Sequence, residues 1–267
     1  MTTQRPADDH GPWRDPRGVP RVRAATRDDL IAALRAGWDD FRAMPAFGLL
    51  VGALYMLGGW LALAAFEARE WRGLTFPVVA GFALVGPFCV VILYEISRRR
   101  ERGLPFGWRD AGSMIRATGR RQIMFLGFVL MFWLAVWSRV GTVIYFVHFG
   151  LHPAPFWELL PEFVSTGRGI SFVIVGHAAG AVFAAVAFSI SVLAFPFLLD
   201  RDADFVTAMV TSVRAVLGSP LVMFGWAVFI GAALAAAMAP LFLGLPLVLP
   251  LLGHASWHLY RRLVEEG

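Results

Sequence analysis

The sequence predicts an all-α fold, a polytopic membrane helix bundle with about six transmembrane helices built from three parallel repeats of an interfacial helix plus a helical hairpin. Composition is the first reason, because 58% of the residues are hydrophobic and only 16% are charged, against roughly 25% charged in a soluble domain. Long apolar stretches and two internal sequence repeats are the other two reasons for this prediction. So much apolar surface cannot be buried in one water-facing globule.

Six stretches reach, or nearly reach, the about 20 apolar residues that cross roughly 30 Å of hydrocarbon. They are residues 46–66, 74–96, 122–141, 170–199, 220–239 and 240–260. Pro240 interrupts the apolar run from Leu221 to Tyr260. Because this run is too long for one span, its two halves are expected to form a tight hairpin.

The arginine distribution predicts the orientation. All 24 basic residues are arginine, which is typical of a GC-rich bacterial genome. Residues 97–121 are rich in arginine, whereas residues 67–73 balance arginine with glutamate, so the positive-inside rule places 97–121 in the cytoplasm. Counting spans then puts both termini in the cytoplasm of a bacterial inner membrane and residues 151–168 in the periplasm.

Residues 1–25 hold prolines among arginines and aspartates and lack an apolar segment. This composition predicts a disordered cytoplasmic tail rather than a signal peptide. Residues 26–264 are then expected to form a single membrane domain.

Two displacements reveal an internal repeat. A shift of 163 positions carries Pro77 to Pro240 and the pair Arg98-Arg99 to Arg261-Arg262. A shift of 175 positions carries Asp29 to Asp204, Ala33 to Ala208 and Pro45 to Pro220. The repeats cover approximately 26–100, 106–200 and 204–264. Because each copy starts on the same side, they are expected to be parallel.

Each repeat is expected to begin with an amphipathic helix on the inner leaflet. Leu30, Leu34, Trp38 and Phe41 share one helical stripe, and Phe205, Met209, Val213 and Val216 repeat it. Thr26 and Asp29 have the spacing of a capping box, and Trp108, Ala111 and Ile115 form a weaker third copy. Small residues spaced four apart predict close approaches of helix backbones, and they are Gly48 and Gly52, then Gly176, Gly180 and Ala184, and then Gly231, Ala235 and Ala239. The alternative is that glycine and alanine are simply frequent in such spans.

The segments FPFLLDRDADFVTAMVTS (195–212), GHASWHLYRR (253–262) and YEISRR (94–99) place charged residues within or beside apolar runs. In this they resemble domain-of-unknown-function family 2189, which consists of predicted bacterial integral membrane proteins. The resemblance covers about Leu30 to Arg262. Some relatives carry a provisional cytochrome c oxidase label, but the family implies no established activity. An oxidase catalytic subunit needs more spans and more histidine ligands.

Three returning helices each end with a polar group followed by arginine. If the repeats surround an axis, these groups form a polar cluster at the cytoplasmic helix ends, consisting of Glu95, Arg98, Asp200, Arg201, His258 and Arg261. Ionisable groups in membrane helices are costly and are candidates for function. The alternative is that they lie shallow, pair with arginines and fix helix ends.

His254 and His258 are four residues apart and so share a helix face, a spacing that suits a metal site. Both are expected to face inward, with Trp257 and Leu259 facing elsewhere. No third strong ligand is evident, and no other cofactor than a metal or haem at this pair is suggested. No hydrolase, kinase or metalloprotease motif is present in the sequence, so an enzyme is not predicted.

The sequence therefore predicts a non-enzymatic inner-membrane protein with a transporter-like or accessory, scaffold role. The alternative is a metal- or haem-handling accessory factor of respiratory oxidase assembly. Despite a net charge of +5, nucleic acid is not the expected partner, because the arginines concentrate beside the spans, where anionic lipid headgroups lie nearer. A membrane-protein partner or a homo-oligomer is the other expected interaction.

Overall fold

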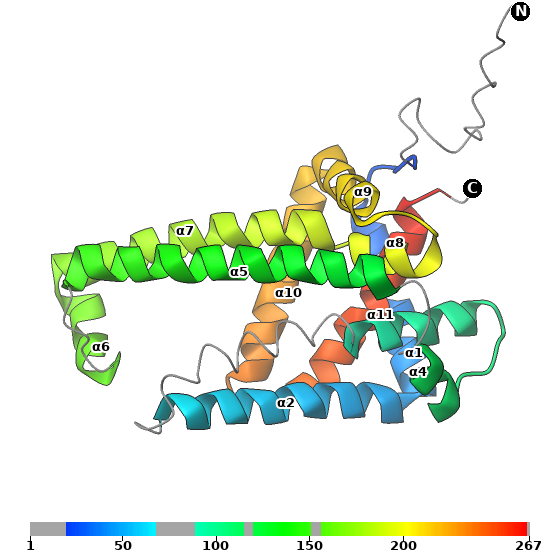
Figure 1. Cartoon of the computed structure of the whole chain (residues 1–267), viewed down its shortest axis with the longest axis horizontal. Coiled ribbons are helices and arrows are strands. Elements are labelled where there is room, and N and C mark those ends of the chain that lie inside the picture. The colour runs from blue at the N-terminus through cyan, green and yellow to red at the C-terminus, as the bar shows by residue number, and fades with distance from the viewer. Residues whose placement is uncertain (1–19, 68–88, 115–119, 151–155, 266–267) are drawn as a thin grey trace, which may run out of the picture. The chain divides into compact units, whose positions relative to one another are not determined.

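The structure is a computed structural model that describes residues 20–67, 89–114, 120–150 and 156–265. Within these residues the fold is all-helical, apart from one isolated antiparallel bridge between Val22 and Val264. The helices are α1 (Arg27–Ala43), α2 (Pro45–Glu67), α4 (Trp108–Met114), α5 (Arg120–Phe149), α6 (Phe156–Ser165), α7 (Gly167–Ser191), α8 (Ala194–Asp200), α9 (Phe205–Gly218), α10 (Pro220–Met238) and α11 (Leu245–Leu263). Residues 89–101 are also helical (Figure 1).

The chain divides into two compact units, Met1–Leu126 with Ser189–Gly267, and Gly127–Phe188. Each is described by itself below. The single membrane domain expected over residues 26–264 stays a prediction.

Among the described residues, four helical stretches are long and apolar enough to cross a membrane. They are Pro45–Ala64, Arg121–Phe149, Gly167–Asp200 and Pro220–Met238. Most of the expected stretch 74–96 lies outside the described residues, and α11, which covers most of 240–260, is not one of the four. The membrane character of the fold is therefore evident, whereas the count of six spans stays a prediction.

Helix α1 begins at the predicted capping box. The Thr26 hydroxyl accepts a hydrogen bond from the backbone N–H of Asp29, and the Asp29 carboxylate accepts one from the backbone N–H of Thr26. These reciprocal bonds satisfy two backbone donors that a helix start leaves free. Helix α9 begins differently, because Asp204 itself is the N-cap and accepts from the backbone N–H of Thr207.

Helices α1 and α9 end in the same way. Met44, with φ −137° and ψ 60°, separates α1 from α2, and Ser219, with φ −150° and ψ 64°, separates α9 from α10. In both cases the next residue is a proline, which begins the following helix. Proline is favourable there because the first helical N–H has no partner inside the helix.

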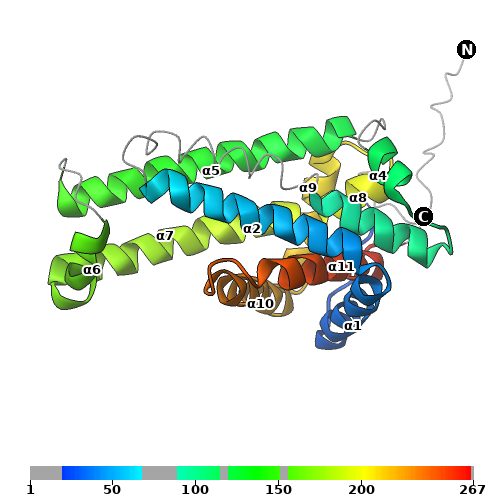
Figure 2. The ribbon, with the colours of Figure 1, turned by 90° about the horizontal axis from the view of Figure 1, so that it is seen from below.

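Helix α11 is the core of the larger unit. A methyl group added at Gly37 of α1 would lie 2.6 Å from the backbone nitrogen of Ala255, and one at Gly52 of α2 would lie 2.3 Å from Cα of Pro246. These distances show that both helix backbones lie directly against α11, and the predicted close approach at Gly52 is confirmed (Figure 2).

Trp257 and Leu259 were expected to face away from the packed side of this helix, and that expectation is wrong. Both are completely buried, as is His254. Helix α11 contacts α1, α2, α8 and α10. Since neighbours surround its C-terminal half, α11 has no single inward face there.

The predicted hairpin between the last two helices is confirmed. Helix α10 ends at Met238 and α11 begins at Leu245. Leu241 and Phe242 lie between them with positive φ angles of 53° and 66°, a region that costs energy for side chains other than glycine. The indole N–H of Trp60 donates to the Leu241 carbonyl at 2.7 Å, which ties this turn to α2.

The smaller unit contains most of α5, with α6 and most of α7. Helices α5 and α7 lie side by side, and the indole N–H of Trp133 donates to the Phe183 carbonyl at 2.9 Å. A cavity of about 710 Å³ in this unit is lined mainly by apolar groups, among them Trp137, Phe172 and Gly176.

The disordered tail expected over residues 1–25 does not extend through residues 20–25. Val22 pairs with Val264, and the backbone N–H of Arg23 donates to the Leu263 carbonyl at 3.0 Å. These backbone bonds hold the segment before α1 against the end of α11. Residues 1–19 lie outside the described residues.

Candidate functional site

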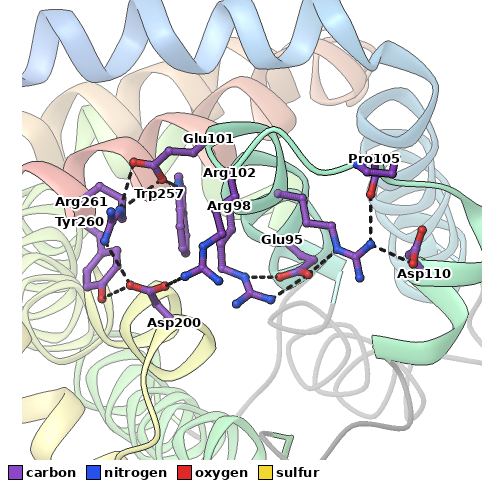
Figure 3. Close-up of polar contacts among 11 residues, drawn as sticks. Glu95, Arg98, Glu101, Arg102, Pro105, Asp110, Asp200, Trp257, Tyr260 and Arg261 are labelled. Carbon is purple, nitrogen blue, oxygen red and sulfur yellow. Dashed lines mark hydrogen bonds and ion pairs between the residues drawn. The ribbon is translucent and has the colours of Figure 1, made fainter. Parts of the chain in front are cut away.

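The most buried carboxylate of the predicted polar cluster is Glu95, in helical segment 89–101, with only 2% of its surface exposed. Arg98 donates from Nε to Oε2 at 2.6 Å and from Nη2 to Oε1 at 2.9 Å. Arg99 donates from Nε to Oε1 at 2.8 Å (Figure 3). Two guanidinium groups of its own helix therefore compensate this charge, and both oxygens are bonded.

Arg99 extends this group of residues to α4. Its Nη1 lies 2.9 Å from Oδ1 of Asp110 and 3.1 Å from the carbonyl of Pro105 (Figure 3). The N–H of Gly107 donates to Asp110, and with the bonds from Arg99 it lowers the pKa of this exposed carboxyl. The loop after segment 89–101 is thus held to that segment.

A second group of residues surrounds Asp200, the last residue of α8. Tyr260 of α11 donates its hydroxyl to Oδ2 at 2.9 Å. Arg102 Nη2 lies 3.1 Å from Oδ1, and Arg261 Nη1 lies 3.4 Å from Oδ2 (Figure 3). Asp200 thereby joins α8, α11 and the end of segment 89–101.

Glu101 adds a further link between segment 89–101 and α11. It accepts from the indole N–H of Trp257 at 3.2 Å and from Nε of Arg261 at 3.2 Å. The indole of Trp257 is fully buried, so this bond satisfies a donor that water does not reach.

His258 does not join Glu95 or Asp200. Its Nε2 lies 2.7 Å from Oδ2 of Asp40 in α1. Arg100 donates from Nη1 to the other oxygen of Asp40 at 3.0 Å and to the Asp39 carbonyl at 2.6 Å. Burial acts to raise the pKa of Asp40, but its bonds to His258 and Ser97 outweigh burial, and the pKa is lowered.

His254 has a different partner from His258. Its Nδ1 lies 2.8 Å from the Ser97 hydroxyl, and its Nε2 is buried with no hydrogen-bond partner among the described residues. In the part of the chain that the structure describes, no group of three or more His, Cys, Asp or Glu side chains could hold a metal ion. A metal at His254 and His258 therefore stays a prediction.

The predicted cluster is thus distributed over three groups. Glu95 lies with Arg98, Asp200 lies with Arg261, and His258 lies with Asp40. Arg201 contacts the Tyr260 hydroxyl at 3.3 Å and the carbonyl of Glu265.

The sequence-based reasoning missed several members, namely Asp40, Ser97, Glu101, Arg102 and Tyr260. Asp40 carried a usable signal. It lies seven residues after Ala33 and three after Gly37, so it shares their helix face. A charge on a face of small residues indicates a buried partner. Glu101 directly follows three arginines and gives no comparable signal.

Long apolar helices with ion pairs gathered at their ends define an integral membrane protein of the helical class. Residues 75–200 match the model of a family described as "Predicted integral membrane protein (DUF2189)". The family resemblance is confirmed over this range, which includes Glu95 and Asp200, while His254 and His258 lie beyond it. No curated protein and no solved structure matches the chain.

Proposed function

We propose that this chain is a non-enzymatic protein of the bacterial inner membrane with an accessory, scaffold role, in which the polar groups hold helix ends together. One observation carries the proposal. The side chains of Glu95, Asp200 and Asp40 are each buried, and each is bonded to at least one arginine of residues 98–102. A carboxylate that carries a proton or an ion across the membrane must exchange partners, whereas these are held by several donors at once.

The depth of α11 relative to α2 supports the same proposal. Gly48 of α2 packs against Pro250 of α11, and α2 begins three residues earlier at Pro45. Because Gly52 packs against Pro246, the two helices run antiparallel. His254 and His258 then lie at the level of α1, before the apolar part of α2 begins. Charged and polar groups cost less at such an interface than in hydrocarbon.

The proposal includes six spans, three parallel repeats and cytoplasmic termini. The matching junctions at Met44-Pro45 and Ser219-Pro220 support the repeat, since both interfacial helices lead into an apolar helix through the same backbone geometry. The bridge between Val22 and Val264 supports an even number of spans, because it holds both ends of the membrane domain on one side.

The scaffold role is tested with Glu95→Gln and Asp200→Asn in the full chain. The first change removes charged contacts to Arg98 and Arg99, and the second removes those to Arg102 and Arg261. We therefore expect lower abundance in the membrane and a lower Tm in detergent. Glu162→Gln is the matched control, since Glu162 pairs with Arg168 at 2.7 Å on the surface of the smaller unit. Unchanged abundance and Tm for both test variants would contradict the scaffold role and favour transport.

The second candidate, a metal- or haem-handling accessory factor of respiratory oxidase assembly, is favoured by the unpartnered Nε2 of His254. His258 lies one turn further along the same helix. Metal analysis and haem absorbance of the purified protein test it, with His254→Ala as the variant and His177→Ala as the control. Bound metal or haem that is lost only in His254→Ala would support this candidate. No bound metal or haem in the unaltered protein would contradict it.

A further inference from the structure

Helix α1 has two faces of opposite character. Its buried face packs on α11 and consists of Asp29, Ala33, Gly37, Asp40 and Phe41. On the opposite side, exposed Arg27, Ile31, Arg35, Trp38 and Arg42 form a set that we call the arginine stripe, and exposed Asp28 and Asp39 lie on its flank. At 3.6 residues per turn, these five positions lie within an arc of about 80°. Cationic and large apolar side chains therefore alternate along one side of α1.

The arginines of the molecule differ in their pairing. The arginines within residues 98–102, such as Arg98 and Arg100, bind carboxylates of the protein. Among the described residues, Arg27, Arg35 and Arg42 have no ion-pair partner. Guanidinium groups beside exposed tryptophan and isoleucine suit the boundary where lipid phosphates meet acyl chains. Asp28 and Asp39 are exposed beside the stripe but, in the part of the chain that the structure describes, form no ion pair with its arginines. These guanidinium groups are therefore available to an anionic group outside the protein.

The chain connectivity places this stripe at a membrane surface. Helix α1 ends at Ala43, and the apolar span candidate Pro45–Ala64 begins two residues later. The break at Met44 turns α1 away from the axis of α2 (Figure 2). Because α2 enters the hydrocarbon near Pro45, α1 has to lie beside the headgroups of that leaflet.

Helix α9 carries an equivalent stripe at the same register. A shift of 175 positions carries exposed Ile31, at 47%, to exposed Val206, at 49%, and it carries buried Ala33 to buried Ala208. The exposed side chains of α9 are Val206, Val210 and Leu217, which we call the apolar stripe. The start of α1 lies beside the end of α9, since the backbone N–H of Ala25 donates to the Ser219 hydroxyl at 2.9 Å.

From these observations we propose that the arginine stripe of α1 binds the phosphate groups of anionic lipids, while the apolar stripe of α9 inserts among the acyl chains of the same leaflet. Arg27, Arg35 and Arg42 supply phosphate-binding guanidinium groups. Ile31 and Trp38 supply the apolar contact that holds the helix at the boundary. Helix α1 thus attaches to the membrane mainly through charge, and helix α9 attaches mainly through apolar side chains. This inference does not depend on the scaffold role.

Depth measurements on the full-length protein in vesicles test the placement. Single variants Ile31→Cys, Val206→Cys and Asp39→Cys are made in a Cys89→Ser background, because Cys89 is the protein's own cysteine, and carry a nitroxide label. We expect labels at positions 31 and 206 to be reached more readily by oxygen than by a water-soluble nickel chelate. The label at exposed position 39, on the flank of the stripe, should show the reverse. Equal nickel access at all three positions would show that positions 31 and 206 lie in water. The stripes would then be surfaces for a soluble protein partner, and the proposal would be overturned.

Lipid dependence tests the charge. The full-length protein is placed in nanodiscs of phosphatidylglycerol or phosphatidylcholine, and its Tm is measured in both. We expect a higher Tm in phosphatidylglycerol and a loss of at least half of that difference in the double variant Arg35→Gln/Arg42→Gln. Arg168→Gln, which changes a paired arginine of the other unit, should preserve the difference. A double variant whose Tm falls equally in both lipids, or a protein with the same Tm in both, would overturn the proposal.

Discussion

The imidazole of His258 in α11 lies 2.7 Å from the carboxylate of Asp40 in α1, and it joins residues that are 218 positions apart in the chain. Arg100 binds the other oxygen of the same carboxylate at 3.0 Å. Three separate segments therefore meet at one aspartate.

Substitutions of His258 should lower stability by an amount that depends on whether the new side chain still donates a hydrogen bond to Asp40. His258→Ala removes the donor to a buried carboxylate and should lower the free energy of unfolding by about 2 kcal/mol. His258→Gln keeps an N–H donor and should cost less than about 1 kcal/mol. Chemical denaturation of the purified protein in detergent measures both. Equal losses for the two variants would contradict this role of the histidine.

Asp29 should make stability depend on pH in acid. Arg23 donates to both oxygens of Asp29, at 2.8 and 2.6 Å, and holds the pKa of this carboxyl well below its ordinary value. The stabilisation is therefore fully present above the unfolded pKa of about 3.9 and is lost as the pH falls towards the folded pKa.

The measurement compares the Tm of the unaltered protein with that of Asp29→Asn at a series of pH values. The difference should be constant from about pH 5 to 8 and should narrow below about pH 4. Asp28→Asn, one residue earlier and exposed, is the control and should show no such narrowing. A Tm difference between the unaltered protein and Asp29→Asn that becomes larger as the pH falls would contradict this prediction.

Glycine replacements should separate packed from open helix faces. A methyl group at Gly52 meets backbone atoms of Leu245 and Pro246, whereas one at Gly225 in α10 meets no atom within 4 Å. Gly52→Ala should therefore force α2 and α11 apart and cost about 1–3 kcal/mol. Gly225→Ala should be neutral or slightly stabilising, because alanine favours helix. Thermal unfolding measures the Tm of both variants. A lower Tm for Gly225→Ala than for Gly52→Ala would contradict the close contact of the two backbones.

Reporter fusions test the topology. With six spans and cytoplasmic termini, a fusion after Gly267 and one within residues 153–162 should report opposite sides of the membrane. An enzyme active only in the periplasm, paired with one active only in the cytoplasm, reads out each position. The same side for both positions would exclude the proposed orientation.

Local features of the fold could be predicted from the sequence. The capping box of Thr26 and Asp29 needs only residues three apart, and the turn after α10 needs only Pro240 and the length of the apolar run. Both depend on interactions within one or two helical turns. The close approach at Gly52 followed from its four-residue spacing from Gly48. The same spacing at Gly176 and Gly180 does not bring the backbone of another described helix within 4 Å of a methyl group added at either glycine, so the spacing alone is not decisive.

The polar site was less predictable. The pairing of Glu95 with Arg98 follows from helical spacing, whereas that of Asp200 with Arg261 joins two different helices and was not predicted. Sequence alone could not place His258 beside Asp40, because that contact depends on how α1 crosses α11. The repeat register had pointed to a meeting of His258 with Glu95, but it says nothing of an aspartate that only the first copy carries.

The contact between α1 and α11 also governs the order in which the chain can be completed. A ribosome synthesises α1 first and α11 last. The contacts of Gly37 with Ala255 and of Asp40 with His258 therefore cannot form until almost the whole protein has been synthesised. Until then the small-residue face of α1 is not covered by α11. The bond from Arg23 to the end of α11 closes only after that docking. A nascent chain released before residue 245 would thus retain the four helices that are apolar enough to cross a membrane yet lack the partner of its first helix. This gives membrane quality control a physical means of recognising an unfinished molecule.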